Sequence, residues 1–252
     1  MSDISRRIIE LAGSEVDYGT RDLSMSPFFS DMGLGFRPGE AGIGSLHLHY
    51  NRKTITLPGT FLDIGIRGPV RSRQGLEAVR QEGAGQEAAF GFFDRNAWLV
   101  ELDGSPAACL DLRADPAPEL HEIRLSLPDP SHAVAACLVP TLDSRDPDIW
   151  VPVLLGLRAV RGSLEAEGDA RVLALPDGEG RLVLALAIQV LDVDEPGLLA
   201  VLGRAPDTVR EAGDRYRDWL AETLDGLDRN VDFSGPDAPL LAEAVLTLVQ
   251  NC

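Results

Sequence analysis

The chain has 252 residues, of which 44% are hydrophobic, a share typical of a globular protein and too high for an intrinsically disordered one. Its formal net charge of −17, without a concentrated basic patch, argues against nucleic acid or an anionic membrane as partners. No run of about 18 apolar residues is present, so we expect no membrane-spanning segment. The amino terminus lacks the apolar core of a secretory signal, and Cys109, Cys137 and Cys252 show no paired spacing. These features predict a cytoplasmic, reducing location.

The first third of the chain predicts one short helix followed by strands. Residues 3–12 place Ile4, Ile8 and Leu11 on one side of an amphipathic helix. The glycine-rich stretch 29–45 is expected to be an irregular connection. Residues 46–51 then alternate between apolar and polar side chains, and 53–68 continue as short strands separated by Gly and Pro. The Gly- and Gln-bearing stretch 71–87 is expected to be a looser connection.

The middle of the chain is rich in strand patterns. Residues 88–112 predict three strands, with the last two joined as a hairpin at Asp103-Gly104. Residues 121–127 alternate as a strand, and two further strand-like segments follow. A second hairpin is predicted over 171–191, turning at Asp177-Gly178. Its second arm is apolar on both faces, which predicts a central strand covered on both sides.

After Asp192 the pattern changes to helices. A short helix is expected over 195–206, and a longer one over 207–227 with Asp207 as its cap. The longer helix has one apolar stripe, formed by Val209, Ala212, Tyr216, Trp219, Leu220, Leu224 and Leu227. Arg210 and Arg217 belong to its polar side, where substitutions are expected to have little effect. The terminal helix over 237–252 is apolar around roughly two thirds of its circumference, an arc too wide for a helix with one buried face.

These elements predict a mainly β fold: a large antiparallel β-sandwich, supersandwich-like, followed by C-terminal helices. We expect residues 1–203 to form the sandwich domain. Residues 204–252 are expected to hold a linker helix and a first barrel-like helix.

Three motifs that suggest a cofactor, a metal or a nucleophile do not meet the requirements of those sites. In the stretch 29–45 the glycine spacing is wrong for a phosphate loop, and a strand follows where a helix is needed. His47 and His49 share a strand face but lack the neighbouring ligands of a metal site. No G-x-S-x-G nucleophile motif is present. We therefore expect no cofactor, no metal and no catalytic residue that the sequence can identify.

One cluster combines carboxylates with an aromatic side chain. Asp143, Asp146 and Asp148 precede Trp150, and sugar sites use aromatic faces beside carboxylates. Trp150 also begins an apolar strand, so packing in the core is the simpler interpretation of this residue. Asp146, Asp148 and Trp150 remain the candidates for contact with a carbohydrate ligand.

The order of elements resembles the N-terminal region of six-hairpin glycosidases, the group of glycogen-debranching-type, trehalase-like and glucoamylase-like enzymes. The matching pieces are the late hairpin GEGRLVLALAIQVLDVDE, the linker-like EPGLLAVLGRAPDTVREAGDRYRDWLAETL with Trp219 on its apolar face, and the helix PLLAEAVLTLVQN. In that group a β-sandwich precedes a linker helix and an (α/α)6 barrel. The resemblance implies that residues 240–249 begin such a barrel.

The resemblance also implies a function for the chain. Those enzymes hydrolyse α-glucosides or oligosaccharides by inversion, using two carboxylates on barrel loops that lie beyond the segment matched here. The chain is then the structural, substrate-shaping portion of a carbohydrate-active enzyme, and it lacks the catalytic residues. Residues 237–252 would bind a helical barrel domain or subunit, or a second copy of the chain. The alternatives are a non-catalytic carbohydrate-binding or protein-interaction module, and a self-contained β enzyme with an unrecognised site.

Overall fold

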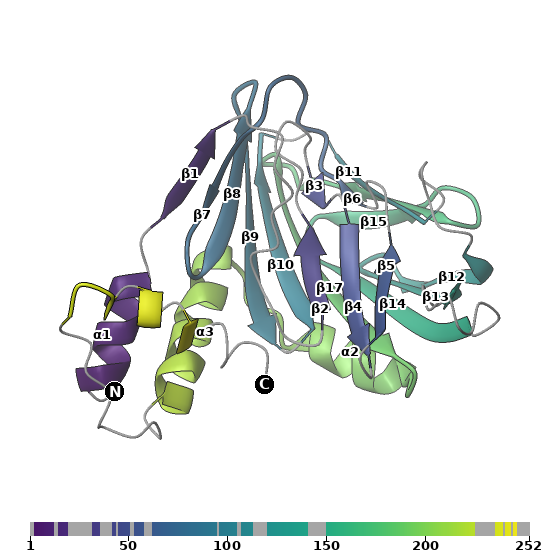
Figure 1. Ribbon diagram of the computed structural model, residues 1–252. Helices are drawn as coiled ribbons and strands as arrows, with labels where there is room; N and C mark the ends of the chain where they lie inside the picture. Colours follow the sequence, from purple (N-terminus) through teal and green to yellow (C-terminus); the bar gives the residue numbers. More distant parts are fainter. Residues whose placement is uncertain are drawn as a thin grey trace.

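The structure of the protein is a computed structural model. It describes residues 3–12, 15–19, 32–35, 42–43, 45–50, 53–57, 62–94, 96–104, 107–112, 120–140, 150–224, 235–238, 240–242 and 244–245. Antiparallel sheets form the body of the molecule, and helices lie at one end of it (Figure 1). The predicted mainly β fold, a sandwich with C-terminal helices, is confirmed.

Within the described residues, the largest sheet has nine strands, and each strand runs antiparallel to its neighbours. In spatial order they are β1 (Val16–Gly19), β7 (Arg71–Gln74), β8 (Ala78–Gly83), β9 (Gln86–Asp94), β10 (Ala97–Asp103), β17 (Arg181–Val190), β14 (Trp150–Arg161), β13 (His132–Pro140) and β12 (His121–Asp129). In the same described part of the chain, two smaller sheets accompany it. One contains β15 (Ser163–Ala166), β16 (Arg171–Leu175), β11 (Ala108–Asp111), β6 (Leu62–Asp63) and β3 (Gly42–Ile43). The other contains β2 (Met32–Gly35), β4 (Ser45–Tyr50) and β5 (Lys53–Leu57).

The main core lies between the nine-stranded and the five-stranded sheets. Trp98 and Phe90 of the large sheet and Leu62 and Ile43 of the smaller one are completely buried there. Alternate residues of each strand point to opposite faces of a sheet. The other face of the large sheet therefore carries a second apolar cluster.

Strand β17 is central and covered on both faces, as its two apolar faces predict. Leu182, Leu184, Leu186 and Ile188 belong to the main core, and Val183, Ala185 and Ala187 to the second cluster. Helix α2 (Glu195–Gly203) covers that second face with Leu198 and Leu202. Gly156 of β14 permits this contact, because a Cβ there would lie 2.7 Å from Leu202 Cδ1 and 2.8 Å from Leu198 Cδ2.

Neither predicted Asp-Gly hairpin forms. Both turns instead carry the chain from one sheet to the other, from β10 to β11 at Asp103-Gly104 and from β16 to β17 at Asp177-Gly178. In the large sheet β10 lies between β9 and β17, so neither of its edges is open to β11. Strand β11 pairs with β16 in the smaller sheet instead. The two Asp-Gly dipeptides correctly predicted changes of chain direction. Which strands then pair depends on the sheet edges that are still open.

Two stretches that were expected to be irregular contain strands. Residues 71–87 form β7, β8 and the start of β9, with a tight turn at Ala84 and Gly85, whose φ angles are 51° and 79°. Residues 29–45 contain β2 and β3. Arg71, Arg73 and Arg80 interrupt the apolar pattern of β7 and β8. Arg71 and Arg73 form ion pairs with Asp17 and Glu15, and Arg80 forms one with Glu87 of β9. The alternation was missed because few apolar side chains mark it.

Helices α1 (Asp3–Ala12) and α3 (Val209–Leu224) lie at the end of the large sheet near β8 and β9 (Figure 1). The predicted Asp207 cap is wrong. The hydroxyl of Thr208, immediately before the helix, accepts a hydrogen bond from the amide of Glu211 at 3.2 Å, the usual geometry of a helix N-cap. A carboxylate oxygen of Glu101 on β10 also accepts from the Val209 amide at 3.0 Å.

Trp219 does not belong to the buried stripe of α3. Its side chain is 47% exposed and stacks on Tyr216 with ring centroids 5.7 Å apart, whereas Tyr216 and Leu220 are buried. Trp219 lies at the margin of the apolar arc of α3. The predicted apolar stripe of α3 is therefore correct for Tyr216 and Leu220, which are buried, and wrong for Trp219 at its margin.

The C-terminal segment is helical at residues 238, 240–242 and 244–245. Ala238 and Ala242 are buried against the main core, whereas Leu240 is 68% and Leu241 38% exposed. Leu227, Leu246, Leu248 and Val249 lie outside the described residues. Within the described part, Ala238, Ala242 and Val245 face the protein, whereas Leu240, Leu241 and Ala244 face outward.

Candidate functional site

Of the predicted carbohydrate contacts, Trp150 is described, and Asp146 and Asp148 lie outside the described residues. Trp150 begins β14 opposite Pro140 of β13. Its half-buried ring contacts that of His121 on β12, with centroids 4.0 Å apart and planes tilted by 56°. Two aromatic rings therefore lie together at one end of the large sheet, and the His121 side chain is exposed.

The histidine pair of β4 keeps its predicted strand geometry. His47 is paired with Thr56 and His49 with Thr54 of β5, so both histidines belong to the same set of alternating positions. Among the described residues, no group of three or more His, Cys, Asp or Glu side chains could hold a metal ion.

Two cysteines and one Asp-Ser-His group in the described part of the chain could in principle act as nucleophiles, but their surroundings are not those of a catalytic site. Burial raises the pKa of the Cys137 thiol to about 11, and burial also raises the pKa of Cys109. Neither cysteine is therefore an activated thiolate nucleophile. Asp129, Ser131 and His132 lie together in the β12–β13 turn, but His132 Nδ1 contacts both Asp129 and Ser131, each at 3.0 Å. A catalytic triad needs opposite ring nitrogens for these two contacts, so the cluster is a turn motif.

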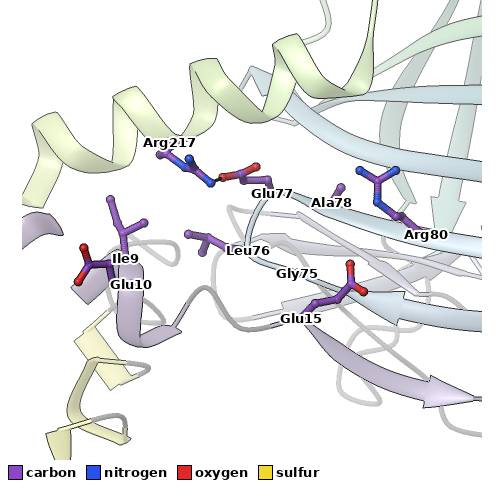
Figure 2. Close-up of a pocket in the computed structure, with 9 residues that line it drawn as sticks. All are labelled: Ile9, Glu10, Glu15, Gly75, Leu76, Glu77, Ala78, Arg80 and Arg217. Carbon is purple, nitrogen blue, oxygen red and sulfur yellow. Dashed lines mark ion pairs between the residues drawn. The ribbon is translucent and has the colours of Figure 1, made fainter. Parts of the chain in front are cut away.

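A pocket that the sequence did not predict lies between α1, α3 and the connection from β7 to β8 (Figure 2). Its volume is about 450 Å³, and we call it the α1–α3 pocket. It is lined by Ile9, Glu10, Glu15, Gly75, Leu76, Glu77, Ala78, Arg80 and Arg217. These residues come from three segments far apart in the sequence, and no local motif connects them.

One wall of the pocket is an ion pair between α3 and the β7–β8 connection. Figure 2 shows the Arg217 guanidinium reaching from α3 to the Glu77 carboxylate. Gly213, one turn earlier on α3, allows the helix to approach, since a Cβ there would lie 3.0 Å from Glu77 Cβ. Arg217 lies on the polar, exposed side of α3, as the sequence predicted, and the fold adds this ion pair with Glu77.

Ion pairs between the N-terminal residues and β7 lie beside the pocket, and Glu15 is the lining residue that takes part in them. Arg73 contacts Glu15 at 3.5 Å, and Arg71 binds Asp17 on β1. The hydrogen bond from Arg71, assisted by the Gly19 amide, lowers the pKa of Asp17 to about 2. The pocket is therefore framed by charged side chains, with Ile9 and Leu76 supplying apolar surface.

Comparisons with known proteins give a fold relationship and no sequence relationship. No family model matches the sequence, and no curated protein matches it significantly. Among solved structures, a family GH92 alpha-mannosidase from Bacteroides thetaiotaomicron matches 98% of this chain with a TM-score of 0.57 and 11% identity. The GH92 family glycosyl hydrolase ccman5 matches 98% with a TM-score of 0.56 and 12% identity. The Bacteroides enzyme in complex with mannoimidazole matches 89% with a TM-score of 0.52 and 11% identity.

The chain spans 41%, 40% and 37% of those three chains, respectively. At 11–12% identity the likeness shows a shared fold. The neighbours are glycoside hydrolases, as the sequence resemblance implied, but they belong to GH92, which is not a six-hairpin glycosidase family. No helix in the part of the chain that the structure describes is long and apolar enough to cross a membrane.

Proposed function

We propose that the chain is the β-sandwich portion of a glycoside hydrolase-related protein that handles α-mannose-containing carbohydrates. The observation that carries the proposal is the match of 98% of this chain to 41% of an α-mannosidase chain. Glycoside hydrolysis requires two carboxyl groups flanking the scissile bond. In this proposal, further polypeptide supplies those groups, and the sandwich shapes the substrate site. α-Glucosides, the class implied by the sequence resemblance, are the comparison ligands.

The proposal predicts binding without turnover. Calorimetric titration of this chain with mannoimidazole and methyl α-mannoside should give saturable heats, and maltotriose and trehalose should bind more weakly. The chain should not hydrolyse 4-nitrophenyl α-mannoside or the corresponding glucoside. Hydrolysis by the chain alone would place a catalytic pair within it. A failure to bind any of these sugars would leave the protein-interaction module as the better candidate.

We further propose that Trp150, with Asp146 and Asp148, contacts the carbohydrate. The half-buried Trp150 ring lies beside the exposed His121 ring at one end of the large sheet. This arrangement supports the assignment, because a ligand could contact both rings there. Loss of the apolar ring face should weaken mannoside binding by about tenfold, corresponding to about 1.4 kcal/mol. The Trp150→Ala variant tests this by titration, and Trp219→Ala is the matched control on α3. Equal affinity of the two variants would remove Trp150 from the site.

The exposed apolar side chains near the C-terminus support a protein partner. Leu240 and Leu241 are neighbours in the C-terminal segment and are 68% and 38% exposed, and Trp219 on α3 is 47% exposed. A contiguous patch of such side chains would be typical of an interface. We propose that residues 237–252 bind a helical domain or subunit, or a second copy of this chain. This surface also favours the second candidate function, an interaction module without catalysis.

A double variant at Leu240 and Leu241 and a control variant on α3 test whether the exposed leucines drive self-association. Leu240→Glu with Leu241→Glu should lower the association constant of self-assembly by about tenfold or more, because each charge replaces an apolar contact. Arg210→Glu, an exposed position on α3, should leave assembly unchanged. Sedimentation velocity over a range of concentrations measures both. A wild-type chain that is monomeric at high concentration and binds no helical partner would contradict this part of the proposal.

The domain boundary and the cellular location predicted from the sequence are also proposals. We place the boundary between the sandwich and the helical segment at residues 203–204, after the end of α2. We also propose a reducing, cytoplasmic location, which agrees with the free thiols of Cys109 and Cys137.

A further inference from the structure

The α1–α3 pocket combines charged groups of both signs with an apolar surface. Glu10, Glu15 and Glu77 contribute carboxylates, and Arg80 and Arg217 contribute guanidinium groups. The lining has a formal net charge of −1, from three Glu and two Arg. Its volume of about 450 Å³ lies within the range of about 300–1,000 Å³ found for small-molecule sites.

This mixture of charges selects among ligand classes. Each charged group of the lining already has a partner of opposite charge: Glu10 has Arg7, Glu15 has Arg73, Glu77 has Arg217 and Arg80 has Glu87. A small anion or cation therefore meets no uncompensated opposite charge in the pocket. A hydroxyl group both donates and accepts hydrogen bonds, so a polyhydroxylated ligand can serve carboxylates and guanidinium groups together. Hydrogen bonds to charged partners are the stronger kind. The Ile9 and Leu76 side chains can pack against the C–H face of a sugar ring.

We propose that the α1–α3 pocket is a second carbohydrate site that binds one or two pyranose units, separate from the Trp150 site. The inference rests on the proposed function for its ligand class. Arg80 and Arg217 donate to sugar hydroxyl oxygens, and Glu15 and Glu77 accept from hydroxyl groups. The Arg217 guanidinium and the Glu77 carboxylate already form an ion pair (Figure 2). A donor and an acceptor therefore lie side by side before a ligand binds.

Methyl NMR of the full chain provides the test. With isoleucine and leucine methyls labelled, methyl α-mannoside should produce saturable shifts at Ile9 and Leu76, and none at Leu198 of α2, which is buried away from both proposed sites. Inorganic phosphate and ethanolamine, as an anion and a cation of small size, should not produce them. The indole N–H signal of Trp150, observed in the same titration, reports separately on the other proposed site.

Matched variants complete the design. Arg80→Gln and Arg217→Gln should each weaken the binding monitored at Ile9 and Leu76 by about tenfold, because each removes a charged donor. Arg210→Gln, on the same helix and exposed, should bind as the wild type does. An unchanged indole signal from the buried Trp98 shows in each variant that the fold is retained.

The outcomes separate this inference from the proposed function. Mannoside shifts at Trp150 alone would overturn the pocket and leave the proposed function standing. Shifts at Ile9 and Leu76 alone would support the pocket and remove Trp150 from ligand binding. Shifts at neither place would overturn both proposals. Pocket shifts with phosphate or ethanolamine but not with mannoside would overturn the ligand class, and equal affinities of Arg217→Gln and Arg210→Gln would overturn the role of Arg217.

Discussion

Replacing Trp98 with alanine is expected to lower the free energy of unfolding by about 3–5 kcal/mol, the usual cost of removing a fully buried aromatic side chain. Trp98 is completely buried on β10. Its ring meets Phe92 edge-on with centroids 6.0 Å apart, and Phe92 meets Tyr216 of α3 at 5.8 Å. The substitution therefore removes the inner end of a row of rings that connects the core with α3. Urea unfolding followed by far-UV circular dichroism measures the change.

Trp219→Ala is the matched control, since it deletes the same side chain at the exposed end of the row. At 47% exposure, Trp219 has much less apolar surface to lose, and the expected change is about 1 kcal/mol or less. Trp98→Phe should lie between the two. The Trp98 Nε1 atom has no hydrogen-bond partner within the described part of the chain, so this replacement also removes an unsatisfied polar group. Similar losses for Trp98→Ala and Trp219→Ala would show that the core is not organised around Trp98.

Replacing Gly162 with alanine is expected to cost about 3–5 kcal/mol, from backbone strain combined with a steric clash. Gly162 connects β14 of the large sheet with β15 of the smaller one, at φ 102°. A Cβ there would lie 2.3 Å from the carbonyl oxygen of Leu175 and 2.7 Å from Leu182 Cδ1. The Leu175 carbonyl belongs to the backbone of β16, so it cannot move without disturbing the strand. Thermal and urea unfolding measure the loss.

Gly168→Ala separates the two contributions. Gly168 also has a positive φ, of 82°, but no atom lies within 4 Å of the position that a Cβ would occupy there. Its substitution should cost about 1–2 kcal/mol from backbone strain alone. A Gly162→Ala variant that is no less stable than Gly168→Ala would mean that the two sheets are not held in close register at this crossing.

Local sequence patterns predicted the structure correctly where it depends on a single strand or helix. The two apolar faces of residues 182–190 predicted a strand covered on both sides, and β17 lies between β10 and β14 with apolar clusters on each face. The helices at 3–12 and near 195–206 were predicted from periodicity, which reports the faces of a single segment. The β-sandwich class followed from the number and spacing of such strands.

Tertiary structure decided whatever depends on partners distant in sequence. Asp103-Gly104 and Asp177-Gly178 mark turns in the sequence, but whether the flanking strands pair depends on which sheet edges are already occupied. Trp219 fits the helix stripe, yet its side chain is 47% exposed in the fold, whereas Tyr216 and Leu220 of the same stripe are buried. Arg217 resembles any solvent-facing arginine until the fold brings Glu77 against α3. The sequence by itself therefore determined the fold class and the elements with a clear apolar periodicity, because periodicity is local, but it did not reveal β2, β3, β7 and β8. The strand partners and the α1–α3 pocket were decided only by the tertiary structure, because they depend on contacts between residues far apart in the chain.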